Sequence, residues 1–192
     1  MTKLDWNVLD IDYQKEADRI AQRLREVTAR ELHKRGLVVA ISGGIDSSCS
    51  VALAVRALGP ERVFALILPE RDSSDDSAAR ANILASHLGI RVETVDIAPA
   101  LAAIGCYRAR DEAVRRALPE YGEGWRFKIV IEGGIDGQIN RFKLVAASPS
   151  GDAVERPLGL SEYLQIVAAT NFKQRIRKNL EYFHADRLNY AV

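Results

Sequence analysis

The part of the sequence best suited to chemistry is a turn of small and polar residues, Ser42-Gly43-Gly44-Ile45-Asp46-Ser47-Ser48. It follows a β-branched apolar run at 37–41 and precedes a small-residue stretch at 47–58 that is typical of a helix. Gly43 and Gly44 allow positive φ and a close approach of the backbone, and the start of a helix directs N–H groups at anions. The hydroxyls of Ser42, Ser47 and Ser48 can add donors. The turn therefore predicts a phosphate-binding cradle.

Asp46 indicates a metal at this cradle. A bare carboxylate repels phosphate, but Mg²⁺ between the two makes both favourable, so we assign Asp46 to the metal. A Gly-Gly pair can also serve only as a tight turn whose Ser or Asp caps the helix. The complete string between a strand and a helix favours phosphate binding, and because no Gly-Lys-Ser/Thr follows, it is not a Walker A loop.

The periodicity of apolar residues predicts the elements that position the turn. An amphipathic pattern with Lys, Arg and Glu between the apolar positions indicates a helix at 13–32. Strands at 37–41, 63–68 and 91–95 then alternate with helices at 47–58 and 75–88. Strands that alternate with helices pair in parallel through right-handed crossovers, which predicts an α/β fold with a parallel sheet.

The alternation stops after the third strand. A charged helical piece is followed by segments at 127–132 and 141–147 that predict a β-hairpin, with Gly133-Gly134-Ile135-Asp136 in its turn. Trp125 and Phe127 are interpreted as packing residues of this hairpin. Residues 161–182 have helical spacing, and 188–192 resemble the start of another strand.

Composition restricts the class of protein. The 192 residues suit one globular domain, and a net charge of +1 predicts neither a nucleic-acid nor a membrane partner. Cys49 and Cys106 are far apart, which argues against a zinc site, an iron–sulfur site or a disulfide scaffold. No stretch approaches the roughly 18 apolar residues of a membrane span, so we expect a soluble, cytoplasmic protein. Cys49 is interpreted as a core residue, and the histidines as surface or helix-end residues: His33, His87 and His184.

The string Ser-Gly-Gly-x-Asp-Ser-Ser resembles the signature of the PP-loop (N-type) ATP pyrophosphatases, and the chain is most similar to the ammonia-dependent NAD synthetases among them. The long first helix, the turn at Leu68-Pro69 with Ser73, Ser74 and Asp76 after it, and Asn171-Phe172-Lys173-Gln174-Arg175-Ile176-Arg177 support the narrower match. The resemblance implies a three-layer, Rossmann-like fold of the adenine nucleotide alpha hydrolase type. It implies one domain at 1–192, with 107–157 as an insertion longer than the family usually has.

The resemblance also implies an activity. Such enzymes cleave ATP between its α and β phosphates to adenylate a carboxylate, here that of nicotinate adenine dinucleotide, which ammonia then attacks. ATP and Mg²⁺ are the implied cofactors, and a homodimer is the implied assembly. The implied catalytic residues are Asp46 and Arg175, and the implied ATP contacts are Ser42, Gly43, Gly44, Asp46, Ser47, Ser48 and Arg177. From the residues alone, Arg175 and Arg177 point to different faces of a helix, and a solvated basic face is the other interpretation.

Two departures from the family affect these expectations. NAD synthetases continue past the fourth strand into a Gly-Thr turn, a downstream metal-binding Glu and a mobile loop, none of which follows before Val192. The sequence can be a fragment, or a reduced relative that needs a partner. We therefore expect the 192 residues alone to bind ATP but to amidate slowly or not at all. The insertion at 107–157 can select another carboxylate.

Other functions stay open. A PP-loop enzyme of sulfur transfer or tRNA modification usually has cysteine pairs or a basic RNA-binding surface, and this sequence has neither. A nucleotide-binding module without catalysis is the alternative from a different class. No glutaminase region is recognisable, so ammonia is expected from solution or from another chain.

Overall fold

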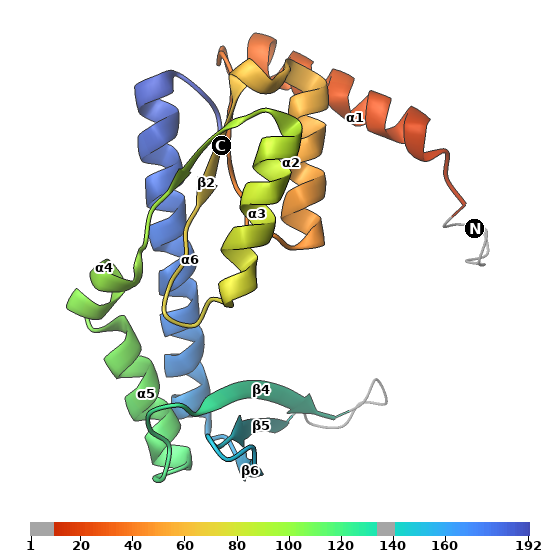
Figure 1. Cartoon of the computed structure of the whole chain (residues 1–192). Helices are drawn as coiled ribbons and strands as arrows, with labels where there is room; N and C mark the ends of the chain where they lie inside the picture. The colour runs from red at the N-terminus through yellow and green to blue at the C-terminus, as the bar shows by residue number, and fades with distance from the viewer. Residues whose placement is uncertain (1–9, 134–140) are drawn as a thin grey trace. The chain divides into compact units, whose positions relative to one another are not determined.

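The computed structural model describes residues 10–133 and 141–192. Contacts divide the chain into two compact units, Met1–Ile97 with Arg177–Val192, and Ala98–Ile176. The long helix α6, Leu160–Leu188, contributes its first part to the second unit and its last part to the first unit (Figure 1). Among the helices of the described segments, none has both the length and the apolar character needed to cross a membrane.

The first unit is built on a parallel sheet of three strands in the order β1-β2-β3: β1 (Leu37–Ala40), β2 (Val63–Ile67) and β3 (Arg91–Thr94). Leu37 pairs with Val63, and Phe64 pairs with Arg91. Every residue of the central strand β2 is buried, as expected for a continuous apolar run that is covered on both faces. The predicted parallel pairing is confirmed.

Helices cover both faces of this sheet. On one face, α2 (Ile45–Leu58) and α3 (Asp75–Leu88) enclose a core that includes Val51, Ala65 and Ala81. The last part of α6 covers the other face (Figure 1). There the ring of His184 stacks on the ring of Phe64, with the ring centroids 5.2 Å apart. The first unit is thus a helix–sheet–helix arrangement, which confirms the predicted three-layer fold.

The first predicted helix consists of two parts. α1 (Tyr13–Glu26) is a regular α-helix, and η2 (Val27–Glu31) continues it with π-helical geometry. α1 packs against α2, where Arg56 forms a 2.6 Å ion pair with Asp18 and Arg25 Nε donates to the carbonyl of Ala57 at 2.7 Å. A short 3₁₀ turn, η3 (Pro60–Arg62), leads from α2 into β2.

The strand expected at 188–192 is reduced to one bridge. Leu188 is still the last residue of α6, and Ala191 pairs with Leu37 in parallel. The N–H of Val38 donates to the carbonyl of Ala191 at 2.7 Å. The extension of the sheet beside β1 is therefore confirmed, but it begins later than the sequence suggested.

The second unit combines helices with an antiparallel sheet. It contains α4 (Ala98–Ala103) and α5 (Cys106–Ala117), followed by β4 (Arg126–Glu132), β5 (Arg141–Ala147) and β6 (Ala153–Pro157). β4 and β5 form the predicted hairpin, and the Gly134-Ile135-Asp136 part of its expected turn lies outside the described residues. The sequence analysis missed β6, because a short, mostly exposed strand that ends in proline carries little apolar alternation.

Aromatic residues hold the second unit together. Trp125 and Phe127 pack against its core of Leu118, Leu144 and other buried residues, which confirms their interpretation as packing residues. Phe142 stacks on Tyr163 with the ring centroids 3.8 Å apart. The segment expected as an insertion, 107–157, lies within this unit, and its status as an insertion stays a prediction.

Two interpretations from the sequence were wrong. Cys49 is exposed, not a core residue, because the core-facing positions of α2 are Val51 and Ala54. His184 is buried with 3% of its surface accessible, because its face of α6 packs on the sheet. The other two histidines, His33 and His87, are exposed as expected.

The buried His184 accepts hydrogen bonds from a cation. Arg187 Nε lies 3.1 Å and Arg187 Nη2 2.7 Å from His184 Nδ1, which therefore needs a free lone pair. Burial lowers the pKa of His184 below its ordinary value of 6.5; the Glu93 carboxylate, 3.8 Å away, opposes this shift, and Arg187 adds to it. His184 is thus neutral in the folded protein near pH 7.

This arrangement predicts a pH-dependent stability. Because the unfolded chain binds a proton at His184 near pH 6.5 and the folded chain does so only at lower pH, the free energy of unfolding should fall as the pH decreases below about 6.5. The contribution reaches at most about 1.4 kcal/mol per pH unit. Urea unfolding at several pH values measures this dependence. The free energy of unfolding should change less steeply with pH in His184→Gln than in the wild type. Equal pH dependences of the free energy of unfolding in wild type and His184→Gln would contradict the assignment.

Candidate functional site

The predicted cradle lies where β1 ends and α2 begins. Ile41 is buried at the end of the strand, and Gly44 is the N-cap residue of α2 with extended backbone angles, φ −86° and ψ 159°. Gly44 brings no side chain to cap the helix. The N–H groups of the first helical turn have no acceptor inside the helix, so they are directed at whatever lies in front of it. This geometry suits an anion.

A network of serines shapes the turn. Ser47 Oγ accepts from the N–H of Ser42 at 3.2 Å and donates to the carbonyl of Gly44 at 3.0 Å. Ser48 Oγ donates to the same carbonyl at 2.8 Å. Since each hydroxyl has a single proton, Ser47 and Ser48 here fix the turn. The N–H groups of Ser42 and Gly44 donate to serine hydroxyls, so the donors left for an anion are the N–H groups of the first turn of α2. The structure thus brings together the serines that the sequence singled out.

Gly43 is the point at which the turn meets α3. Its φ is +73°, and a Cβ atom there would lie 2.6 Å from the carbonyl oxygen of Ser77 and 3.0 Å from Cβ of Arg80. A side chain at this position would therefore be strained by its backbone and would also collide with α3. Only glycine permits this close approach.

The loop between β2 and α3 supplies the second wall of the site. Parallel strands direct their carboxyl ends to the same edge of a sheet, so this loop lies beside the cradle. Ser73 Oγ accepts from the N–H of Glu70 at 3.0 Å, and the hydroxyls of Ser74 and Ser77 lie 2.6 Å apart. The serines after Leu68-Pro69 that the sequence singled out therefore order the loop that leads into α3.

Arg80 is a further candidate residue of this site, and the sequence analysis did not single it out. Its Cβ lies beside Gly43, and its side chain is exposed, with a 3.7 Å ion pair to Asp76. Surface ion pairs of this kind contribute little, so the guanidinium can turn to an anion. The sequence carried no signal for Arg80 apart from its place one turn after Asp76, because its position depends on the contact between α3 and the turn.

Asp46 lies in the first turn of α2 with an exposed side chain. Within the described segments, no hydrogen bond or ion pair engages its carboxylate, and no group of three or more His, Cys, Asp or Glu side chains is arranged to hold a metal. A metal at Asp46 would thus take its other ligands from water and phosphate. That donor set fits Mg²⁺, which keeps several waters and is usually held by one or two carboxylates together with substrate phosphates.

The two arginines expected to contact the nucleotide lie on α6. Arg175 is exposed and belongs to the second unit, whereas Arg177 is half-buried and begins the last segment of the first unit. Two residues apart on a helix, they point to different sides of it. Their contacts with a nucleotide stay predictions.

A parallel sheet covered by helices on both faces, with a strand, a Gly-Gly turn and a helix at its carboxyl edge, is the α/β architecture of the PP-loop class. The sequence matches the NAD synthase family over residues 16–120, and the chain belongs to that family. The predicted family membership is confirmed.

Characterised relatives are considerably longer than this chain. It is 50% identical over 187 residues to the NH₃-dependent NAD⁺ synthetase of Rhizobium meliloti, a match that covers 97% of the chain and 56% of the relative. It is 47% identical over 186 residues to the NH₃-dependent NAD⁺ synthetase of Mesorhizobium japonicum, and this match covers 96% of the chain and 58% of the relative. The chain thus spans a little over half the length of these relatives.

Solved structures share the fold. An NH₃-dependent NAD synthetase from Campylobacter jejuni in complex with the nitrate ion superimposes with a TM-score of 0.54 at 20% identity, over 94% of this chain and 55% of that protein. An NAD⁺ synthetase from Burkholderia pseudomallei superimposes with a TM-score of 0.55 at 21% identity, over 94% of this chain and 60% of that protein. At this level of identity the similarity establishes the fold alone.

Proposed function

We propose that this chain is the ATP-binding part of an ATP-dependent, ammonia-dependent amide ligase of NAD biosynthesis. The enzyme would adenylate the carboxylate of nicotinate adenine dinucleotide, release pyrophosphate, and let ammonia displace AMP. The observation that carries the proposal is the cradle at Ser42–Ser48, held against α3 at Gly43. The names and sequence identities of the relatives support the ligase chemistry.

In this mechanism the chain binds the phosphates of ATP through backbone N–H groups. The first turn of α2 and the open backbone at Gly43 and Gly44 would surround the phosphates, where fixed dipoles stabilise the negative charge that develops on the leaving pyrophosphate. The hydrogen bonds of Ser47 keep these dipoles oriented. Mg²⁺, when bound at Asp46, would supply positive charge against the phosphate oxygens.

Cationic side chains complete the proposed ATP site. Arg80 lies against the turn at Gly43 and can exchange its weak ion pair with Asp76 for a phosphate. Arg177 is proposed as an ATP contact, and Arg175 as the catalytic cation that helps hold ATP for attack at its α phosphate. Arg175 is exposed and therefore accessible to a ligand.

The remaining parts of the proposal concern the surroundings of the enzyme. A homodimer and a cytoplasmic location are proposed, and the thiols of Cys49 and Cys106 suit a reducing compartment. Ammonia is proposed to come from solution or from another chain. The segment 107–157 is proposed to influence which carboxylate is accepted.

The products of ATP cleavage test this function. With ATP, Mg²⁺, ammonia and nicotinate adenine dinucleotide, a longer form that carries the C-terminal region of the relatives should form AMP and pyrophosphate in equal amounts with NAD, and the 192 residues alone should do so slowly or not at all. Ser47→Ala, which removes three hydrogen bonds of the turn, should lower the rate of AMP formation about tenfold to hundredfold. Ser50→Ala is the matched control, because its hydroxyl bonds only the carbonyl of Asp46 within α2.

Two outcomes would contradict the proposal. Formation of ADP and phosphate would exclude cleavage between the α and β phosphates. If AMP forms at a rate that does not depend on nicotinate adenine dinucleotide, cleavage of ATP between the α and β phosphates stands, but the substrate is another carboxylate.

A further inference from the structure

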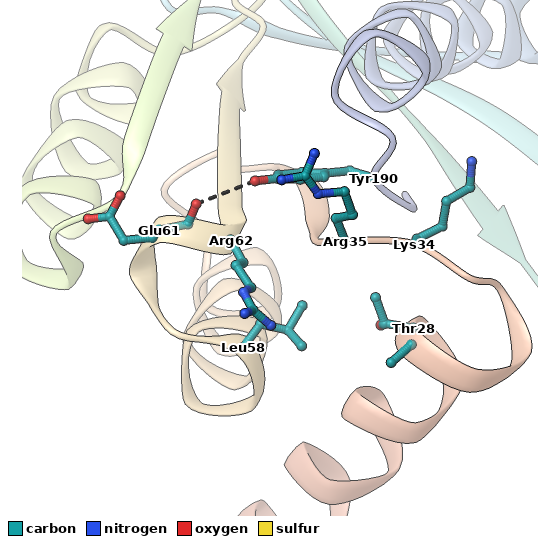
Figure 2. A pocket seen from close by; sticks show the side chains of 8 residues that line it. Thr28, Lys34, Arg35, Leu58, Glu61, Arg62 and Tyr190 are labelled. Carbon is teal, nitrogen blue, oxygen red and sulfur yellow. Dashed lines mark hydrogen bonds between the residues drawn. The ribbon is translucent and has the colours of Figure 1, made fainter.

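A cavity of about 400 Å³ lies in the first unit at the end of the sheet opposite the cradle (Figure 2). Its wall consists of residues that precede β1 and β2, together with parts of η2, α2 and the end of the chain: Thr28, Ala29, Lys34, Arg35, Leu58, Glu61, Arg62 and Tyr190. We call it the rear cavity. Because β1 is four residues long, about 13 Å of strand separates it from the turn at Ser42. The rear cavity is therefore a separate site.

The rear cavity is strongly basic. Its lining includes three cationic residues, Lys34, Arg35 and Arg62, and one acidic residue. That residue is Glu61, whose carboxylate points away from the other labelled side chains in Figure 2. In the described part of the chain, neither Arg35 nor Arg62 forms an ion pair, and the Lys34 ammonium donates to the neutral side-chain oxygen of Asn189 at 3.2 Å. The cavity thus gathers positive charge that the described residues leave uncompensated.

Unusual backbone surrounds the rear cavity. Thr28 and Ala29 belong to the π-helical η2, a geometry that occurs often at functional sites. Among the described residues, the only non-glycine positions with positive φ are His33 and Asn189, both at 53°. They directly precede the lining residues Lys34 and Tyr190. Each of them follows the end of a helix, η2 or α6, where a residue with left-handed backbone commonly terminates the helix.

The base of the rear cavity is fixed. The N–H of Arg35 donates to the carbonyl of Asn189 at 2.9 Å, and Lys34 donates to the carbonyl of Thr28 at 2.8 Å. The ring of Tyr190 lies directly against Gly36, where a Cβ would come within 2.6 Å of it, and its hydroxyl donates to the carbonyl of Glu61 at 3.4 Å (Figure 2). Arg35 and Arg62 therefore extend from an anchored backbone.

We propose that the rear cavity binds a phosphate group, either as free phosphate or pyrophosphate or as part of a small phosphorylated molecule. Guanidinium groups bind phosphate oxygens through two parallel hydrogen bonds, and Arg35 and Arg62 provide two such groups beside one cavity. The volume lies within the range of small-molecule sites. The buried hydroxyl of Thr28 adds a polar group at the wall.

Site-resolved NMR of the complete chain tests the proposal. Inorganic phosphate, and separately pyrophosphate, should shift the amide signals of residues 28–36, 58–62 and 189–191, with saturation in or below the millimolar range. Signals at 42–48 report the cradle independently, so failure of the cradle is distinguishable from failure of the rear cavity. Stronger binding of pyrophosphate than of phosphate would indicate a diphosphate ligand, and the reverse a single phosphate group.

A double variant localises the binding. Arg35→Gln with Arg62→Gln should raise the Kd measured from the rear-cavity signals at least about tenfold while the cradle signals titrate as before. Arg30→Gln with Arg108→Gln removes the same charge from two exposed arginines outside the cavity and should change neither Kd. Absence of saturable shifts at the rear cavity, equal shifts with chloride, or an unchanged Kd in the double variant would overturn the proposal.

Discussion

Gly43→Ala is expected to abolish measurable binding of Mg²⁺-ATP and to lower the free energy of unfolding by about 3 kcal/mol. Two effects add at this position. The backbone has a φ of +73°, which alanine adopts only with strain, and the new methyl group would lie 2.6 Å from the carbonyl oxygen of Ser77 on α3. Relief of this collision would move the turn away from α3 and would separate the backbone donors of the cradle.

A control at Gly89 separates the two effects. Gly89 also has a positive φ, +66°, but nothing lies within 4 Å of the Cβ that alanine would add. Gly89→Ala should therefore cost only about 1 kcal/mol of stability and leave ATP binding intact. Urea unfolding and calorimetry with Mg²⁺-ATP measure both properties. If the two variants lost equal stability, the collision between the turn and α3 would not contribute to the destabilisation of Gly43→Ala.

Asp46→Asn is expected to remove the dependence of ATP binding on Mg²⁺. In the wild type, the exposed carboxylate at the start of α2 would bind the metal, so adding Mg²⁺ should raise the affinity for ATP. In the variant, Mg²⁺-ATP should bind about tenfold or more weakly, equivalent to roughly 1.4 kcal/mol. Without Mg²⁺ the variant should bind ATP at least as well as the wild type, because a carboxylate that repels the phosphates has been removed.

This opposite response to the metal distinguishes a metal ligand from a structural residue. Calorimetry in the presence of Mg²⁺ and in the presence of a chelator measures it directly. Glu112→Gln, an exposed carboxylate in the second unit, serves as the control and should bind ATP like the wild type in both conditions. If Asp46→Asn weakened binding equally with and without Mg²⁺, Asp46 would act on the turn and not on a metal.

The elements around the cradle were predictable because their signals are local. A buried apolar run, the Gly-Gly turn and a small-residue stretch follow one another within residues 37–58. They directly predict a strand, a tight turn and a helix. The same holds for the pair β4 and β5, whose apolar alternation is strong. By contrast, β6 was missed because most of its side chains are exposed.

Side-chain surroundings were less predictable. Whether Cys49 or His184 is buried depends on the face of a helix that another part of the chain covers, and helical spacing alone did not show this. The orientation of α2 about its own axis places Cys49 on the exposed face of the helix. The packing of α6 on Phe64 buries His184, which the sequence analysis interpreted as a surface or helix-end residue.

The amino-acid sequence by itself was sufficient to predict the parallel α/β fold and the position of the Gly-Gly turn, because a turn of contiguous residues is defined by their own backbone preferences. The PP-loop class followed from the resemblance of that turn to the family signature. Tertiary structure was needed for everything that joins distant segments. Arg80 reaches the turn only because α3 packs on Gly43, and the rear cavity exists only because the segments around Arg35, Arg62 and Tyr190 meet at one end of the sheet. Such contacts arise from packing between elements, for which the linear sequence carries no local signal.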